Sequence, residues 1–289
     1  MRVLVTGAAG KLGSLAVAAL AERGHEVRAT DTRFRGDLAV PLRPHNLLDE
    51  YALYPLLEGC DALVHLGNHP NRFAGPSFQR LLAENTSMNA NAFMAALDCG
   101  VRHIVFASSL QVMLTSDGTR AEPHRIPYLP LDANAPADPG LNPYALSKQI
   151  AEDFLRVAVR AKPELAVTVL RYPMLVAEWF KARLSVNGGR VPRDFLHLGE
   201  ATAHLTFEDG ARLIACALER SQPGYRQFFP AQTLDVTNVG PRGLIERFYP
   251  QVPLRVPLEG IERLVDISDL ERELGFAPSE RIQVQLLDA

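Results

Sequence analysis

A strand-like run and a glycine-rich turn set the architecture of this 289-residue chain: Val3-Leu4-Val5-Thr6-Gly7-Ala8-Ala9-Gly10-Lys11-Leu12-Gly13. A segment of helical period follows directly. Glycines between a strand and a helix let the chain turn tightly, bring backbone N–H groups against a pyrophosphate, and let the helix pack close to the strand. The spacing Gly-x-x-Gly-x-x-Gly is not the commonest one, and on its own it also fits a flexible turn.

An acidic residue, Asp31, ends the second strand-like run, which begins at Val27. In dinucleotide-binding folds, an acid about 20 residues beyond the glycine turn holds the adenosine ribose hydroxyls. Its charge favours NAD over NADP, whose 2'-phosphate it would repel. Arg33, two residues on, would partly reverse this preference for NAD. NAD is therefore the predicted cofactor and NADP the alternative.

Short β-branched runs alternate with longer segments of helical period in the first 170 residues. Strands are predicted at 3–6, 27–31, 62–66, 104–107 and 166–170, and helices from about Lys11, near Asp49, from about Ser77 and from Pro143 to Ala161. Such alternation is typical of βαβ units. The predicted fold is α/β, a Rossmann-like doubly wound parallel sheet with a smaller C-terminal substrate lobe.

The predicted domain division follows from where this alternation stops. Residues 1–175 form the NAD-binding domain, and residues 205–235 return to it because they contain a helical stretch and an apolar strand candidate. Residues 176–204 and 236–289 form the substrate lobe. The proline-rich segment 113–143 is predicted to be a long loop that covers the active site.

Composition excludes several functional classes. The formal net charge of -3 leaves no basic footprint for nucleic acid. No signal peptide and no apolar run of membrane-spanning length are present, which predicts a cytoplasmic protein without membrane contact. Cys60, Cys99 and Cys216 are too few and too far apart for a zinc site or a disulfide framework, so no metal is predicted. The expected partner is a small-molecule substrate.

Tyr144 and Lys148 lie four residues apart near the start of the predicted helix 143–161, so their side chains point the same way. The unperturbed pKa of tyrosine is about 10, and a neighbouring lysine cation is expected to lower it. Such a pair supplies a base for a hydroxyl or an acid for a carbonyl. A pair with this spacing also occurs by chance on helix surfaces. Ser108 and Ser109 end the strand predicted at 104–107, at the edge where ligands of open α/β sheets bind.

Together these residues resemble the extended short-chain dehydrogenase/reductase superfamily, often labelled NAD-dependent epimerase/dehydratase, over nearly the whole chain. The resemblance implies a homodimer and a catalytic trio of Ser109, Tyr144 and Lys148. It also implies cofactor contacts beyond the glycine turn and Asp31, at Thr32, Arg33, Asn46, Leu47, Leu66, Gly67, Asn85, Ala107, Ser108, Tyr144, Lys148, Tyr172 and Pro173. Candidate substrate contacts are Asn68, Ser109, Gln111 and Arg183, although Arg183 also fits a solvated basic face.

Departures from the family pattern narrow the expected substrate. Leu110-Gln111 stands where 4,6-dehydratases of the family carry an acidic pair, which argues against dehydration. The asparagine expected near Met174 and the arginine expected near Thr202 in nucleotide-sugar epimerases are absent, which argues against a nucleotide sugar. The phrase His65-Leu66-Gly67 resembles uronate dehydrogenases, but their Asn-His pair after the serine is missing.

Three functions follow from the sequence. The first is an NAD-dependent oxidoreductase that moves a hydride between NAD and a hydroxyl or keto carbon of a small sugar-like or polyol substrate. The second is an NAD-dependent sugar epimerase that uses the same hydride chemistry twice. The third is a regulatory protein that binds the dinucleotide without turnover, and the intact catalytic trio argues against it.

Overall fold

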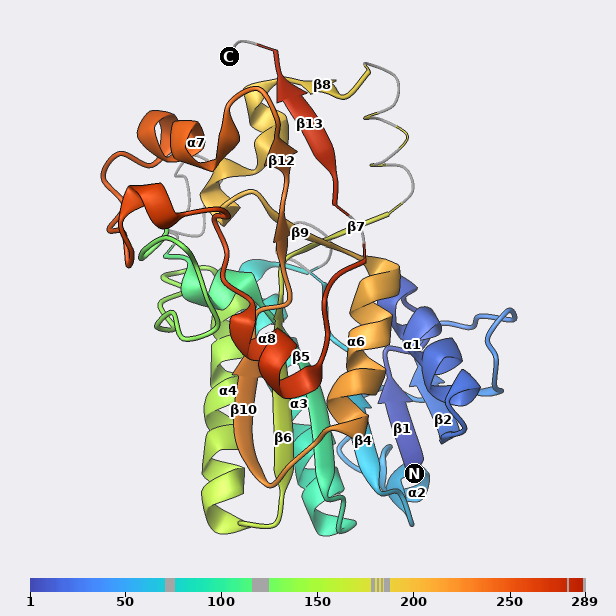
Figure 1. The fold of residues 1–289 in the computed structure, drawn as a ribbon. Helices are drawn as coiled ribbons and strands as arrows, with labels where there is room; N and C mark the ends of the chain where they lie inside the picture. Colours follow the sequence, from blue (N-terminus) through green and yellow to red (C-terminus); the bar gives the residue numbers. More distant parts are fainter. Residues whose placement is uncertain are drawn as a thin grey trace.

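The computed structural model describes residues 1–70, 76–115, 125–177, 180, 182, 184, 188–279 and 281–287. Its centre is one parallel sheet built from β1 (Arg2–Thr6), β2 (Glu26–Asp31), β3 (Leu42–Pro44), β4 (Ala62–His65), β5 (His103–Ser109), β6 (Ala166–Tyr172) and β10 (Gly224–Phe228). The strand order is β10-β6-β5-β4-β1-β2-β3 (Figure 1). This order is that of a doubly wound nucleotide-binding sheet with one added strand, which confirms the predicted fold class.

Helices cover both faces of the sheet. The helices α1 (Lys11–Glu22) and α6 (Phe207–Glu219) pack together on one face, and α3 (Phe78–Asp98) and α4 (Pro143–Ala161) pack together on the other (Figure 1). Side chains alternate between the two faces along each strand. In β1, Val3 and Val5 therefore join the core under α1 and α6, whereas Leu4 joins the core under α3 and α4.

Capping residues fix where the helices begin. Asn142 Oδ1 accepts hydrogen bonds from the N–H groups of Tyr144 and Ala145, at 3.2 and 3.4 Å, and Pro143 occupies the first helical position. Both features are typical of a helix N-terminus, so the predicted helix from Pro143 to Ala161 is confirmed. The helix expected near Asp49 begins later, because the Asp49 side chain accepts a hydrogen bond from Tyr51 N in a turn. The helix α2 spans Tyr54–Leu57.

Small elements lie beyond the carboxyl ends of the central strands, in the upper part of Figure 1. One small sheet contains β7 (Met174–Val176), β9 (Ala203–Thr206) and β11 (Gln232–Thr233), and another contains β8 (Arg190–Val191), β12 (Asp235–Val236) and β13 (Gln283–Leu286). In the described residues this part also contains α7 (Gly240–Phe248) and the 3-10 turns η1 (Leu110–Met113), η2 (Arg193–Leu196), η3 (Leu198–Glu200) and η4 (Leu258–Gly260). The helix α8 (Ser268–Leu274) lies lower in Figure 1, in front of the central sheet. The predicted division into an NAD-binding domain and a substrate lobe, with the residue boundaries given above, stays a prediction.

The segment predicted as a long loop, 113–143, is described except for 116–124. Its described part is held to the C-terminal region by single bridges from Leu129 to Leu254 and from Leu131 to Val265. Within the described ranges, none of the helices combines the length and the apolar character that crossing a membrane requires.

Candidate active site

The glycine turn between β1 and α1 requires glycine at two positions. Gly7 has a left-handed backbone with φ 68°, and a Cβ there would lie 2.7 Å from the carbonyl carbon of Leu66. A Cβ at Gly13 would lie 2.1 Å from Gly7 O. Gly10 caps α1 without a side chain, so no side-chain cap occupies this helix N-terminus. Such an end is suited to an anion such as a pyrophosphate, so the turn fits a dinucleotide.

The carboxylate of Asp31 lies against this turn. Its oxygens accept hydrogen bonds from Ala9 N, at 3.1 Å, and from Arg33 N, at 3.0 Å. The Arg33 side chain is 73% exposed, and its Nε lies 3.8 Å from Asp31 Oδ1. Thr32 contributes a longer contact of 3.5 Å from its hydroxyl. Arg35, which was not predicted from the sequence, donates from Nη1 to Ala9 O at 3.4 Å.

Two further loops meet the glycine turn from β3 and β4. Thr6 Oγ1 accepts from the N–H groups of Leu66 and Gly67, at 3.2 and 3.3 Å. Leu47 is buried and touches Gly67, where an added Cβ would lie 2.5 Å from Leu47 Cδ1. Asn46 is exposed, and its Oδ1 accepts from Leu48 N at 3.0 Å. The structure thus brings the predicted residues of these three loops together.

A buried histidine, which the sequence did not assign to the site's support, joins these loops to α3. His65 Nδ1 lies 2.7 Å from Thr6 Oγ1, and His65 Nε2 lies 2.9 Å from Asn89 Oδ1. Burial lowers the pKa of His65 to about 3, and the charge of Lys148 contributes to the lowering. The ring is therefore neutral at physiological pH and connects β1, β4 and α3 below the glycine turn.

Lys148 lies one helical turn after Tyr144, as predicted, and is 3% exposed. Its Nζ donates to Ala107 O at 2.7 Å and to Asn68 Oδ1 at 2.6 Å, and lies 5.7 Å from the centroid of the Tyr144 ring. Asn68 Nδ2 is buried and, in the described part of the chain, has no hydrogen-bond partner. A buried donor without a partner costs free energy, which points to a ligand oxygen at this place.

The loop that carries Asn68 is fixed by Asn85, which is fully buried in α3. Asn85 Oδ1 accepts from His69 N at 2.8 Å, and Asn85 Nδ2 donates to Ser147 Oγ at 3.3 Å. Asn85 thus connects the loop after β4 to the helix that carries Tyr144 and Lys148. These contacts support the backbone of the site, whereas the predicted direct contact of Asn85 with cofactor stays a prediction.

The two serines at the end of β5 point in different directions. Ser108 Oγ donates to Glu152 Oε1 at 2.7 Å in the buried interior. Ser109 Oγ accepts from Gln111 N at 3.2 Å and forms a hydrogen bond with Tyr144. Ser109 is therefore the serine hydroxyl beside Tyr144. The hydroxyl of Ser108 already has a buried partner, and the predicted cofactor contact of Ser108 stays a prediction.

The side chain of Tyr172 also points into the interior of the protein. Its side chain is 5% exposed, and its hydroxyl donates to Gly210 O in α6 at 2.9 Å. The ring therefore packs between β6 and α6. The predicted cofactor contacts of Tyr172 and Pro173 stay predictions, and for Tyr172 the backbone is the part that remains at the carboxyl edge of the sheet.

The protonation equilibria differ from the sequence prediction. Burial raises the pKa of Tyr144 to about 12, the hydrogen bond with Ser109 lowers it, and the charge of Glu200 raises it further. Burial lowers the pKa of Lys148 to about 7, and the charge of Glu152 opposes this. The expectation that Lys148 sets a low pKa for Tyr144 is thus wrong for the protein alone. The free-energy cost of removing the phenolate from water exceeds the stabilisation that neighbouring groups provide.

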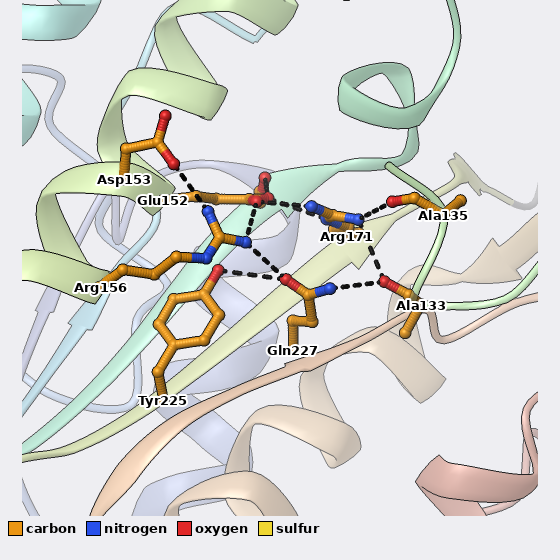
Figure 2. Close-up of polar contacts among 9 residues, drawn as sticks. Ala133, Ala135, Glu152, Asp153, Arg156, Arg171, Tyr225 and Gln227 are labelled. Atoms are coloured by element: carbon orange, nitrogen blue, oxygen red, sulfur yellow. Dashed lines mark hydrogen bonds and ion pairs between the residues drawn. The ribbon is translucent and has the colours of Figure 1, made fainter. Parts of the chain in front are cut away.

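Below the site, a buried ion pair fixes the loop that leads into α4 (Figure 2). Arg171 donates from Nε and Nη2 to both carboxylate oxygens of Glu152, at 3.0 and 2.7 Å. Its Nη1 donates to the carbonyl oxygens of Ala133 and Ala135, at 3.1 and 2.9 Å. Gln227 in β10 also donates to Ala133 O, at 2.7 Å. Arg171 is the only charged residue in 166–172, and a charge within a predicted strand is the sequence signal that could have indicated this network.

Above the site, hydrogen bonds link three polar side chains between the N-cap of α4 and η3. Asn142 Nδ2 donates to Gln111 Oε1 at 2.9 Å, and Gln111 Nε2 donates to Glu200 Oε1 at 3.4 Å. Glu200 was not predicted from the sequence, where it stands in a segment without a motif. Arg183 lies outside the described residues. In the described part of the chain, no group of three or more His, Cys, Asp and Glu side chains is arranged to hold a metal ion.

Two curated relatives oxidise sugars according to their names. Uronate dehydrogenase of Pseudomonas putida is 33% identical over 158 residues, which are 53% of this chain and 53% of that protein. L-arabinose 1-dehydrogenase (NAD(P)(+)) of Haloferax volcanii is 36% identical over 124 residues, 42% of this chain and 47% of that protein. The chain spans about half the length of these curated relatives.

The solved UDP-glucose 4-epimerase from Bifidobacterium longum, in complex with NAD+ and UDP, aligns with a TM-score of 0.67. The alignment covers 97% of this chain and 94% of that chain at 18% identity, so it shows a shared fold. The model of a sequence family, described as the NAD dependent epimerase/dehydratase family, matches residues 3–223. With this match over most of the chain, the protein belongs to the NAD dependent epimerase/dehydratase family.

Proposed function

We propose that this protein is an NAD-dependent oxidoreductase that moves a hydride between the nicotinamide and a hydroxyl or keto carbon of a small sugar-like or polyol substrate. The observation that carries the proposal is the convergence of Ser109, Tyr144 and Lys148 at the carboxyl edge of the sheet. Family membership and the two sugar dehydrogenase relatives support the same class of reaction.

Three features of the chain fit NAD. The N-terminus of α1, which no side chain caps, suits a pyrophosphate, and the Asp31 carboxylate suits ribose hydroxyls. Asn68 Nδ2 and Lys148 Nζ offer N–H donors beside Tyr144 for ribose or substrate oxygens. When bound, oxidised NAD supplies the hydride acceptor.

The residues of the chain handle the proton. In the oxidising direction, the Tyr144 phenolate accepts the proton of the substrate hydroxyl, and in the reducing direction the phenol returns it. Ser109 binds the same substrate oxygen through its hydroxyl. Lys148 binds the loop after β4 through Asn68 and the end of β5 through Ala107.

A screen of polyols, aldoses and uronates with NAD, read as NADH absorbance, tests the proposal. Net NADH formation with one class of compound is the expected result. Sugar interconversion without net NADH would indicate the epimerase alternative. Saturable NAD binding without any turnover would support the regulatory alternative and overturn the proposal. The homodimer and the cytoplasmic location stay predictions.

NAD is expected to bind at least about tenfold more tightly than NADP, a difference of about 1.4 kcal/mol. Asp31 is the reason, because its carboxylate accepts hydrogen bonds from ribose hydroxyls and repels a phosphate. Calorimetric titration of both cofactors measures the ratio, and Asp31→Asn should reduce it. Equal affinities in the wild type would show that Arg33 outweighs Asp31, and Arg33→Ala would then restore the preference for NAD.

Ser109→Ala is expected to move the pH profile of substrate oxidation to higher pH. The Ser109 hydrogen bond lowers the pKa of Tyr144, and the phenolate is the active form, so loss of this bond raises the pH at which the rate increases. The measurement is kcat/KM against pH. Ser108→Ala is the matched control, because that hydroxyl contacts Glu152 instead. Equal profiles for both variants would contradict the role of Ser109.

A further inference from the structure

A buried amide beside Lys148 has a hydrogen-bond donor that the described residues do not use. Lys148 Nζ donates to Asn68 Oδ1 at 2.6 Å. Because a lysine ammonium donates hydrogen bonds and accepts none, this bond directs the amide oxygen toward Lys148 and the amide nitrogen away from it. Asn68 Nδ2 is buried, and in the described part of the chain it has no hydrogen-bond partner. Folded proteins seldom leave a buried donor in this state, so an acceptor from outside the chain is expected there.

The loop around Asn68 is held on both sides, so the position of this donor is set before a ligand binds. Thr6 Oγ1 accepts from the N–H of Gly67 at 3.3 Å. Asn85 Oδ1 accepts from His69 N at 2.8 Å, and Asn85 Nδ2 donates to His69 O at 3.3 Å. A donor that is already fixed loses little conformational entropy when it binds an acceptor. Asn68 is therefore preorganised for binding.

The place of Asn68 in the fold indicates which acceptor it meets. The preceding residue, Gly67, lies against the glycine turn, where an added Cβ would be 3.2 Å from Gly7 N. On the other side, Lys148 Nζ lies 5.7 Å from the centroid of the Tyr144 ring. In NAD, one ribose connects the pyrophosphate, which suits the glycine turn, to the nicotinamide, which exchanges the hydride. This ribose carries two hydroxyl groups, and each hydroxyl oxygen can accept a hydrogen bond.

We propose that Asn68 is a cofactor-binding residue whose Nδ2 donates to a hydroxyl oxygen of the ribose that carries the nicotinamide. The inference rests on the NAD site of the proposed function, but not on the substrate or on the direction of the reaction. It differs from the sequence expectation that Asn68 contacts the substrate. By binding this ribose, Asn68 holds the end of the cofactor that faces Tyr144.

Calorimetric titration with NAD, ADP-ribose and ADP tests the inference without turnover. ADP-ribose keeps the second ribose and lacks the nicotinamide, and ADP lacks both. Asn68→Ala should weaken the binding of NAD and of ADP-ribose by about fivefold or more, because one hydrogen bond is lost. The affinity for ADP should stay within about twofold of the wild type. Asn134→Ala is the matched control, since Asn134 is exposed, and it should change none of the three affinities.

Asn68→Ala also removes an acceptor from Lys148, so the titrations are repeated in a Lys148→Met background. There, Asn68→Ala should still weaken the binding of ADP-ribose by about threefold or more, because the contact with the ribose is direct. The melting temperature without ligand should stay the same or rise, since a buried amide without a partner is removed. A merely structural role would lower all three affinities and the melting temperature together, and would overturn the inference.

Two other results would also overturn the ribose contact. Unchanged affinity for ADP-ribose with a raised KM for substrate would identify a substrate contact, and a loss confined to NAD would assign the amide to the nicotinamide. Asn68→Leu, which keeps the size of the side chain without its polar atoms, gives the same measurement if Asn68→Ala does not fold. These results leave the proposed function intact, whereas NAD binding without turnover by the wild type would overturn the proposed function alone.

Discussion

Tyr144→Phe is expected to bind NAD as the wild type does and to lose turnover by roughly 10² to 10⁴. The substitution keeps the ring and its packing at the start of α4 but removes the group that carries the proton. The hydrogen bond with Ser109 disappears with it, while Lys148 keeps its bonds to Asn68 and Ala107. Steady-state kinetics on the substrate found in the screen, with a separate titration of NAD, measures both quantities.

Tyr225→Phe is the matched control for this experiment. Tyr225 lies on β10, and its hydroxyl makes one long bond of 3.4 Å to Gln227 at the side of the buried network (Figure 2). The same atom is removed, so turnover should stay within about twofold of the wild type. Retention of more than a tenth of the activity by Tyr144→Phe would show that another group carries the proton.

Glu152→Gln is expected to lower the free energy of unfolding by about 3–5 kcal/mol. Arg171 is 1% exposed, and the substitution leaves its guanidinium buried without a negative partner on α4. The hydroxyl of Ser108 donates to the same carboxylate, so its partner changes too. Urea unfolding, followed by circular dichroism at a fixed pH, gives the difference.

The neighbouring residue on α4 provides a contrast in the same helix. Asp153 is 59% exposed and pairs with Arg156 at 2.8 Å (Figure 2). An exposed ion pair contributes about 0–1 kcal/mol, so Asp153→Asn should have a small effect. Similar losses for Glu152→Gln and Asp153→Asn would contradict the importance assigned to the buried pair.

The parts of the site that follow from local sequence rules could be predicted. The glycine turn, the strand before it and Asp31 depend on residues close together in the chain. The limits of α4 depend on Asn142 and Pro143, which act on the adjacent helical turn. The one-turn spacing of Tyr144 and Lys148 follows from these limits, because a helix places residues four apart on one face.

The parts that depend on tertiary packing could not be predicted. Alternation along β5 implies that Ser108 and Ser109 face opposite sides, and the choice of Ser109 came from the family resemblance. The bond from Ser108 to Glu152, which is distant in sequence, required the folded chain. Glu200 reaches the site from a segment without a motif, so its contact with Gln111 required the folded chain.

The pKa of Tyr144 shows the same limit in energetic terms. Helical spacing places a cation nearby, which led to the expectation of a lowered value. The desolvation that raises the pKa to about 12 depends on burial by elements distant in sequence. The spacing rule therefore predicted that Lys148 lies near Tyr144 but did not determine the electrostatics of the two groups.

Transfer of a deuterium label tests the central claim most directly. The substrate identified in the screen would carry deuterium on the carbon that bears the reacting hydroxyl, and the recovered cofactor and product would be weighed by mass spectrometry. We predict that NADH accumulates with one deuterium per oxidised molecule and that the keto product or lactone has lost it. Label returned to an epimeric sugar without net NADH, or label left on an unchanged substrate, would contradict the assignment of this protein as an oxidoreductase.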